Sequence, residues 1–188
     1  MNVLIIYAHP NHESFNYAIL RQVQNAVSKA HSVTTLDLYE QGFDPILRFD
    51  EQHKRSDLAK NPETEKYRDL ISKADHIIFI FPIWWSGTPA ILKGFIDRVF
   101  TAGFAYSYKK TGLKGHLLGK SAWIITTHNT PSFVVPFAED YGKVLKNQIL
   151  KPCGISPVKL TGLTPVEKIS DEKRREFLDK ISKTASGI

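Results

Sequence analysis

Short apolar runs alternate with stretches of helical periodicity along this chain, and that alternation predicts its elements. The runs are rich in Val, Ile, Leu and Phe, which is typical of strands that are buried on both faces of a parallel sheet. Strands are expected at residues 3–8, 32–38, 76–81, 121–126 and 157–160. The segments between them carry apolar residues three and four positions apart, which indicates amphipathic helices.

Capping residues fix where several of these helices begin. The first follows Ser14, and its inner face carries Phe15, Ile19, Val23, Ala26 and Val27. Further helices are expected at residues 67–73, from Thr88 with Pro89 in the first turn to near Phe100, at residues 137–150, and after Ser170 with Phe177, Leu178 and Ile181 on one face. Residues 47–65 are charged and weakly periodic, which indicates a long loop with a short helix, a kind of segment that often serves binding or dimerisation.

Five strands that alternate with helices predict a doubly wound parallel sheet in one domain, residues 1–188. Two strand orders are common in such sheets. The first strand is not followed by the glycine fingerprint of dinucleotide-binding folds, which favours the flavodoxin-like order 2-1-3-4-5 with a mononucleotide-type phosphate site.

Composition narrows the class of protein. The 188 residues carry a formal net charge of +6, but the basic residues are scattered among acids, so we expect no nucleic-acid binding. Cys153 is the only cysteine, and His9 with His12 has no third ligand nearby, so neither a disulfide nor a metal site is expected. No apolar segment reaches the roughly 20 residues of a membrane span, and a strand begins where a signal peptide would stand. We therefore expect a cytoplasmic protein without membrane insertion.

Aromatic and polar loops follow the predicted strands and are expected to meet at one edge of the sheet, where open α/β sheets bind ligands. After the third strand come Pro82, Ile83, Trp84 and Trp85, which suit a flat heterocycle but equally fit a packed turn of the core. After the first strand, His9 and Ser14 stand before a helix N-terminus that favours an anion, although Ser14 is also explained as a cap alone.

Two later loops carry similar signals. Residues 101–112 are expected to form a loop with aromatic side chains, among them Tyr106 and Tyr108, which indicates a stacking wall, an oligomer contact or a cover for the core edge. The segment from Thr127 to Phe133 follows the fourth strand and is expected to face the same crevice.

The chain resembles the NAD(P)H:quinone oxidoreductase family, flavoproteins with the flavodoxin-like fold. The resemblance runs in order and at compatible spacing from residue 1 to about residue 160. It is carried by Ala8-His9, Glu13 to Ala18, Asp37 to Tyr39, Phe81 to Ile83 with Trp85, Gly87, Pro89 to Gly94, Arg98 to Phe100, Phe104 to Tyr108, Thr126-Thr127 and Cys153-Gly154. Each motif alone is weak, and their ordered combination is specific.

The resemblance implies two-electron hydride transfer from NAD(P)H through a flavin, FMN or FAD, to a quinone-type acceptor in a homodimer. It assigns the flavin's phosphate and ribityl chain to His9, Ser14, Phe15 and Asn16, and one edge of the isoalloxazine to Pro82, Ile83, Trp84 and Trp85. It assigns the pyrimidine end of the ring to Thr126, Thr127, His128 and Asn129. Tyr106 and Tyr108 would wall the substrate pocket from the partner subunit.

The chain departs from the family at His128-Asn129, where Gly-Gly is common, and at Trp84, where animal members have glutamine. The animal members also place a tyrosine and a histidine beyond this loop, and residues 132–141 show no histidine and no clearly aligned tyrosine. We hypothesise that His128 takes over their charge-stabilising role. Two other functions remain open at this point: a flavoprotein regulatory subunit of a potassium efflux system, and a flavodoxin-type electron carrier.

Overall fold

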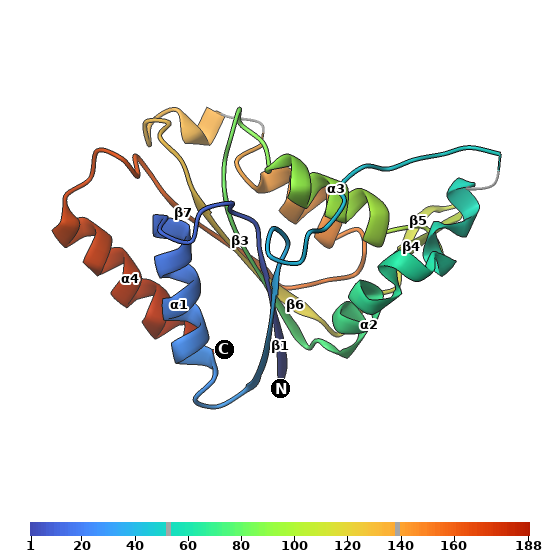
Figure 1. Cartoon of the computed structure of the whole chain (residues 1–188), viewed down its shortest axis with the longest axis horizontal. Coiled ribbons are helices and arrows are strands. Elements are labelled where there is room, and N and C mark those ends of the chain that lie inside the picture. The colour runs from blue at the N-terminus through green and yellow to red at the C-terminus, as the bar shows by residue number, and fades with distance from the viewer. Residues whose placement is uncertain (52–53, 138–139) are drawn as a thin grey trace.

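A five-stranded parallel sheet forms the centre of the molecule, with the strand order β2-β1-β3-β6-β7 (Figure 1). The computed structural model describes residues 1–51, 54–137 and 140–188. The strands are β1 Asn2–Tyr7, β2 Ser32–Asp37, β3 His76–Pro82, β6 Ser121–Thr127 and β7 Val158–Leu163. This order is the flavodoxin-like 2-1-3-4-5 pattern, so the predicted fold class is confirmed.

Helices cover both faces of the sheet, as its two-sided apolar strands require. Helices α1 (Phe15–Val27) and α4 (Asp171–Ala185) pack together on one face, and α2 (Glu65–Lys73) and α3 (Ala90–Val99) lie on the other (Figure 1). All seven residues of β3 are buried. The core therefore consists of two apolar layers, one on each side of this strand.

The parallel register brings the carboxyl ends of four strands to one edge. Tyr7 of β1 lies opposite Ile80 of β3, and Pro82 lies opposite Thr127 of β6, which in turn lies opposite Leu163 of β7. The loops after these strands therefore begin at nearly the same height in the sheet, which confirms the expectation that they share a crevice.

The predicted helix at 137–150 is correct only in its second part. Residues 143–150 are helical, with Leu145–Leu150 of the π type, whereas Asp140 to Gly142 are not helical and Val135–Phe137 forms a separate 3₁₀ turn. Tyr141 and Gly142 have φ angles of 59° and 87°, in the left-handed region that a right-handed helix excludes. Residues 138–139 of that prediction lie outside the described residues.

The predicted start of α3 is also corrected. Pro89 is the residue before the helix rather than part of its first turn, and no side chain caps this end, so Thr88 is not the cap. Pro89 has an extended ψ of 145°, and the helix begins at Ala90.

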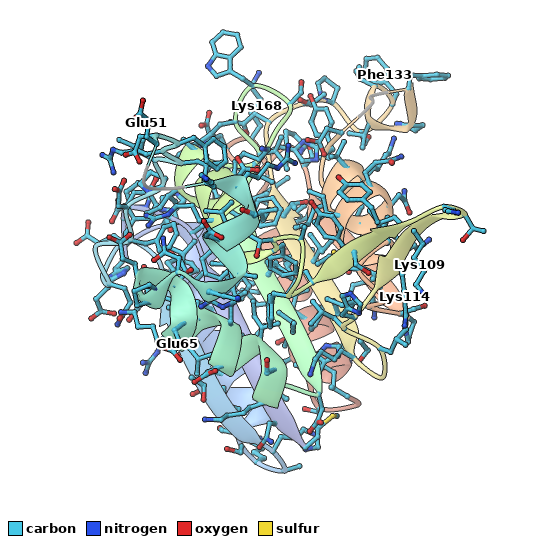
Figure 2. All side chains as sticks on the ribbon, turned by 90° about the vertical axis from the view of Figure 1, so that its right-hand side faces the viewer. Glu51, Glu65, Lys109, Lys114, Phe133 and Lys168 are labelled. Atoms are coloured by element: carbon cyan, nitrogen blue, oxygen red, sulfur yellow. The ribbon has the colours of Figure 1, made fainter. Side chains whose placement is uncertain are left out.

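Residues 106–115 form a two-stranded antiparallel hairpin where the sequence led us to expect a loop. Its strands are β4 (Tyr106–Lys109) and β5 (Gly112–Gly115), and Figure 2 shows it projecting from the side of the molecule with Lys109 and Lys114 toward its outer part. Gly112, with a φ of 120°, permits the reversal between the strands. At the base of the hairpin, Gly115 lies so close to the backbone of Cys153 that a Cβ there would come within 2.3 Å of its carbonyl carbon.

The long segment between β2 and α2 is held on the protein by two buried arginines. Arg98 of α3 donates to the backbone oxygen of Asp44 and to the carboxylate of Glu63. Arg68 of α2 donates to the backbone oxygens of Leu58 and Asn61. The segment itself contains 3₁₀ turns at Arg55–Lys60 and Pro62–Thr64, in agreement with the predicted loop and short helical portion.

Cys153 is buried, and its burial raises the pKa of the thiol to about 11.

Among the described residues, no helix has both the length and the apolar character needed to cross a bilayer.

Candidate functional site

A cavity of about 710 Å³ opens at the carboxyl edge of the sheet. The loops after β1, β3, β6 and β7 form its walls, which is the position expected for a ligand site in a doubly wound sheet. The lining residues are His9, Ser14, Phe15, Asn16, Pro82, Ile83, Trp84, Trp85, Ser86, Thr127, His128, Asn129, Thr130, Tyr141, Val166, Glu167 and Arg174.

The loop after β1 presents polar groups at the N-terminus of α1. Ser14 caps this helix by accepting a hydrogen bond from the Tyr17 N–H. His9 Nδ1 lies 3.0 Å from the Asn11 N–H, which donates, and 3.1 Å from the Asn11 carbonyl oxygen, which accepts, so this nitrogen is held by Asn11 in either tautomer of the ring. Burial is the main cause that lowers the pKa of His9. The helix N-terminus and a neutral imidazole donor together favour an anion.

A buried hydrogen bond joins the first and third loops of the site. Asn16 Nδ2 donates to Thr127 Oγ1 at 2.8 Å, and Asn16 is only 4% exposed. Its other polar atom, Oδ1, has no partner among the described residues. Buried carbonyl oxygens in native proteins normally have a partner, so the hydrogen bonding of this part of the cavity wall is incomplete in the protein alone.

The turn after β3 is a tight reversal with unusual backbone geometry. Trp84 and Gly87 exchange backbone hydrogen bonds of 3.1 Å in both directions, and Ile83 N–H donates to Thr127 O. The backbone N–H groups of Ile83 and Trp84 are therefore already used within the protein. In the described chain, the N–H groups of this turn without a partner are those of Trp85 and Ser86.

The loop after β6 places His128 at the floor of the cavity. His128 is 6% exposed, and its Nδ1 has no partner among the described residues. Burial lowers the pKa of this histidine below its ordinary value, so the ring is neutral at pH 7. A neutral imidazole offers one donor and one acceptor to a ligand.

Tyr141 packs against His128 with ring centroids 4.9 Å apart and planes at 71°. Its hydroxyl lies 2.8 Å from Thr130 Oγ1 and 3.4 Å from Ser86 Oγ. The sequence interpretation missed this tyrosine, because it saw no aligned tyrosine and placed the residue inside a helix. The dipeptide Tyr141-Gly142, a helix-breaking glycine beside an aromatic residue, was the available signal.

The sequence interpretation also missed the wall that follows β7. Arg174 donates to the backbone oxygen of Val166 and pairs with Asp171, and the N–H of Glu167 donates to Asn129 Oδ1. These contacts put a guanidinium and a carboxylate on the cavity's rim. In the sequence, a basic residue near the start of a charged helix that lines a cavity looks the same as a basic residue that is fully exposed to solvent.

Most residues proposed from the sequence come together here. His9, Ser14, Phe15, Asn16, Pro82, Ile83, Trp84, Trp85, Thr127, His128 and Asn129 all line the cavity. Thr126 does not, because it is 1% exposed inside β6. Tyr106 and Tyr108 lie on the hairpin and line a different cavity of about 540 Å³ with Phe49, Leu58 and Leu113.

The arrangement suits a planar heterocycle that carries a phosphate. Tryptophans and a proline form the apolar side, and a helix N-terminus lies at one end for an anion. Neutral His128 and Asn16 are polar residues of the lining between these two parts. The residues present therefore fit a flavin, and we infer that they would hold one.

Comparison with known proteins places the chain among flavodoxin-like proteins. A family model described as flavodoxin-like fold matches residues 1–185. The crystal structure of Smu.1420 from Streptococcus mutans UA159 has 69% sequence identity, a TM-score of 0.98 and full coverage of both chains. The NAD(P)H:quinone oxidoreductase from Methanothermobacter marburgensis has 28% identity and a TM-score of 0.86, and the match covers 99% of this chain and 96% of that chain.

Among curated proteins, an uncharacterized NAD(P)H oxidoreductase of Haemophilus influenzae is 34% identical over 185 residues, which are 95% of this chain and 91% of that protein. The chain spans only about half, 54%, of the curated guinea-pig and rat quinone dehydrogenases that it also matches.

Proposed function

This chain belongs to the flavodoxin-like fold family and, within it, to the NAD(P)H:quinone oxidoreductases, and on that basis we propose that it is a flavin-dependent reductase of quinones or related acceptors. The observation that carries the proposal is the cavity at the strand ends, with its buried, unpaired Asn16 Oδ1 and His128 Nδ1. Both atoms belong to residues that line the cavity, and a polar ligand bound there would complete their hydrogen bonding. The two other functions raised from the sequence receive no support from the matches reported above, whose names indicate oxidoreductases where they name an activity.

The chemistry that a bound flavin supplies is acceptance of a hydride from NAD(P)H at N5 and its donation to the acceptor in a second step. The protein's part is to bind and orient. Ser14 and the first turn of α1 would hold the phosphate, with the His9 ring beside them. Trp84 and Trp85 would lie along one edge of the ring, and Asn16 would be positioned by Thr127.

His128 would act at the pyrimidine end of the ring, where negative charge develops during reduction. Because its burial keeps the ring neutral, it would hold that charge through a hydrogen bond rather than through a full positive charge. Tyr141 packs on its face and restricts its rotation. The proposal therefore assigns His128 the charge-stabilising role and Tyr141 a supporting one.

We further propose that the enzyme is a cytoplasmic homodimer in which Tyr106 and Tyr108 of each subunit complete the partner's pocket. The support is their exposure on a projecting hairpin: Tyr108 is 71% exposed and Leu113 is 45% exposed. Apolar side chains in such a position favour an interface.

The first test is made on the purified protein. The flavin is released by heat and identified, which distinguishes FMN from FAD, and NAD(P)H oxidation is followed with and without benzoquinone. We expect a yellow protein that oxidises NAD(P)H rapidly only when the quinone is present. A protein that binds no flavin even in excess contradicts the proposal.

Replacing His128 with alanine should slow flavin reduction by NAD(P)H by about tenfold to a hundredfold, because a hydrogen bond to developing charge is lost in a site shielded from water. Stopped-flow absorbance measures that rate, and a flavin titration measures binding. We expect the dissociation constant to change less than the rate. An unchanged reductive half-reaction would remove His128 from the mechanism.

A further inference from the structure

Three non-glycine residues of the described chain have left-handed backbone conformations, and all three meet at the mouth of the cavity. They are Trp85 with φ 50°, Ser86 with φ 66° and Tyr141 with φ 59°. A left-handed conformation reduces the population of a non-glycine residue by roughly tenfold or more, so something must hold it in place.

Tyr141 contacts this turn through both its backbone and its side chain. Its N–H donates to the backbone oxygen of Ser86 at 3.2 Å. Its hydroxyl accepts a hydrogen bond from Ser86 Oγ at 3.4 Å and lies 2.8 Å from Thr130 Oγ1. Ser86 lies on the loop after β3 and Thr130 on the loop after β6, so the phenol connects two walls of the cavity.

The turn so held carries the two unpaired N–H groups of Trp85 and Ser86. Successive N–H groups in a turn of this kind form a small concavity that binds an oxygen or an anion. Trp85 also has a fully exposed side chain, so the indole makes no contact that would fix the turn itself. In the described part of the chain, the hydrogen bonds that join this turn to the segment after β6 are those of Tyr141 and of Ile83, and the Trp84 ring lies 5.9 Å from the His9 ring of the loop after β1.

We infer that Tyr141 is a positioning residue: its hydroxyl forms a latch, a pair of hydrogen bonds that joins the Trp84–Gly87 turn to the loop after β6. This latch keeps the two adjacent free N–H groups, those of Trp85 and Ser86, directed toward a ligand in the cavity. The link to a flavin rests on the proposed function. The latch itself is a property of the protein without ligand. The hydrogen bonds with Ser86 and Thr130 lower the pKa of the phenol.

The test begins with Tyr141→Phe, which retains the ring on His128 and removes both hydroxyl contacts. We expect the amide of Gly87, which donates to Trp84 O, to exchange about fivefold faster with deuterium in the flavin-free protein. The flavin dissociation constant should rise by a similar factor, and the KM for NAD(P)H should rise while kcat at saturation changes by less than twofold. Tyr39→Phe, on the loop after β2, is the matched control and should leave all of these values unchanged.

A second substitution separates a latch from any other role of the hydroxyl. Glycine adopts φ near +66° readily, so Ser86→Gly stabilises the turn without help from Tyr141. In the double variant Tyr141→Phe, Ser86→Gly, amide exchange and flavin affinity should return to within about twofold of the original protein. Failure of this rescue, or unchanged exchange in Tyr141→Phe alone, would overturn the latch.

The outcomes also separate the latch from the proposed function. Faster exchange in Tyr141→Phe with rescue by Ser86→Gly, in a protein that binds no flavin, supports the latch and contradicts the flavin assignment. Flavin binding with normal exchange in every variant supports the assignment and contradicts the latch.

Discussion

The variant Asn16→Ala is expected to bind flavin about 30-fold to 100-fold more weakly than the original protein. Asn16 lines the cavity, its Nδ2 donates to Thr127 Oγ1 at 2.8 Å, and its buried Oδ1 has no partner among the described residues. The truncation removes a ligand acceptor and leaves the Thr127 hydroxyl without its donor. Each such loss in a buried site costs about 1–3 kcal/mol, and every 1.4 kcal/mol is a factor of ten in affinity. Fluorescence titration of the flavin-free protein measures the change.

A control on the same helix makes this result specific. Gln24 Nε2 donates to Thr35 Oγ1 at 2.7 Å, at the opposite end of α1 from the cavity. Gln24→Ala should therefore lower the free energy of unfolding, measured with urea, but leave the flavin dissociation constant within about twofold. If Asn16→Ala lowers only the free energy of unfolding and leaves the flavin affinity unchanged, the flavin does not contact Asn16.

Gly94→Ala is expected to destabilise the protein by about 3 kcal/mol, with a drop of roughly 10 °C in melting temperature. A Cβ at this position of α3 would lie 2.2 Å from the backbone oxygen of Pro45 and 2.4 Å from its Cβ. The Pro45 segment would have to move away from the helix. That movement would disturb Phe43, whose ring packs edge-on against Phe95 at 5.4 Å, and the bond from Arg98 to Asp44 O.

The sign of this effect is diagnostic. In an exposed helix, replacing glycine with alanine stabilises by about 1 kcal/mol, because alanine has the higher helix propensity. Gly187→Ala provides a matched control, since the nearest atoms to its added methyl group are 3.7 Å away. The melting temperature of this control, measured by thermal unfolding, should lie within about 2 °C of that of the original protein. A more stable Gly94→Ala variant would show that the segment at Pro45 does not rest on α3.

The sheet was predictable because burial on both faces leaves a strong mark on a strand. Ile77 to Phe81 are all 0% exposed, and only apolar side chains are stable in such a strand. The strand order followed from the first loop, which lacks the glycines of the alternative order. A strand that is buried on both faces along its whole length can therefore be predicted from its residue composition.

The segments around the cavity were harder to predict because their conformation depends on contacts between loops. The periodicity of residues 137–150 resembles a helix, but left-handed Tyr141 and Gly142 direct the chain to Ser86 and Thr130 instead. The hairpin at 106–115 was similar: its pairing is local, but the anchoring of Gly115 on Cys153 depends on residues nearly forty positions away.

The candidate site was predictable where a strand ends and a resemblance names the following residues. The loops after β1, β3 and β6 met that condition. Arg174 and Glu167 did not, because a charged residue near a helix start is normally solvated and shows no distinguishing pattern. In the turn after β3, the N–H groups of Ile83 and Trp84 pair within the protein, which leaves those of Trp85 and Ser86 free, a division that no residue pattern shows.

The environment of Cys153 has a chemical consequence for an enzyme that handles quinones. Quinones are electrophiles that add to thiolates, and a thiolate is the reactive form of cysteine. With the pKa of its thiol raised to about 11 and only 4% of the residue exposed, the only cysteine of the chain is almost entirely protonated at neutral pH and shielded from solvent. The Cys153 thiol is thus protected from arylation by the quinones that the protein is proposed to reduce. Repeated turnover is therefore expected to leave this cysteine unmodified.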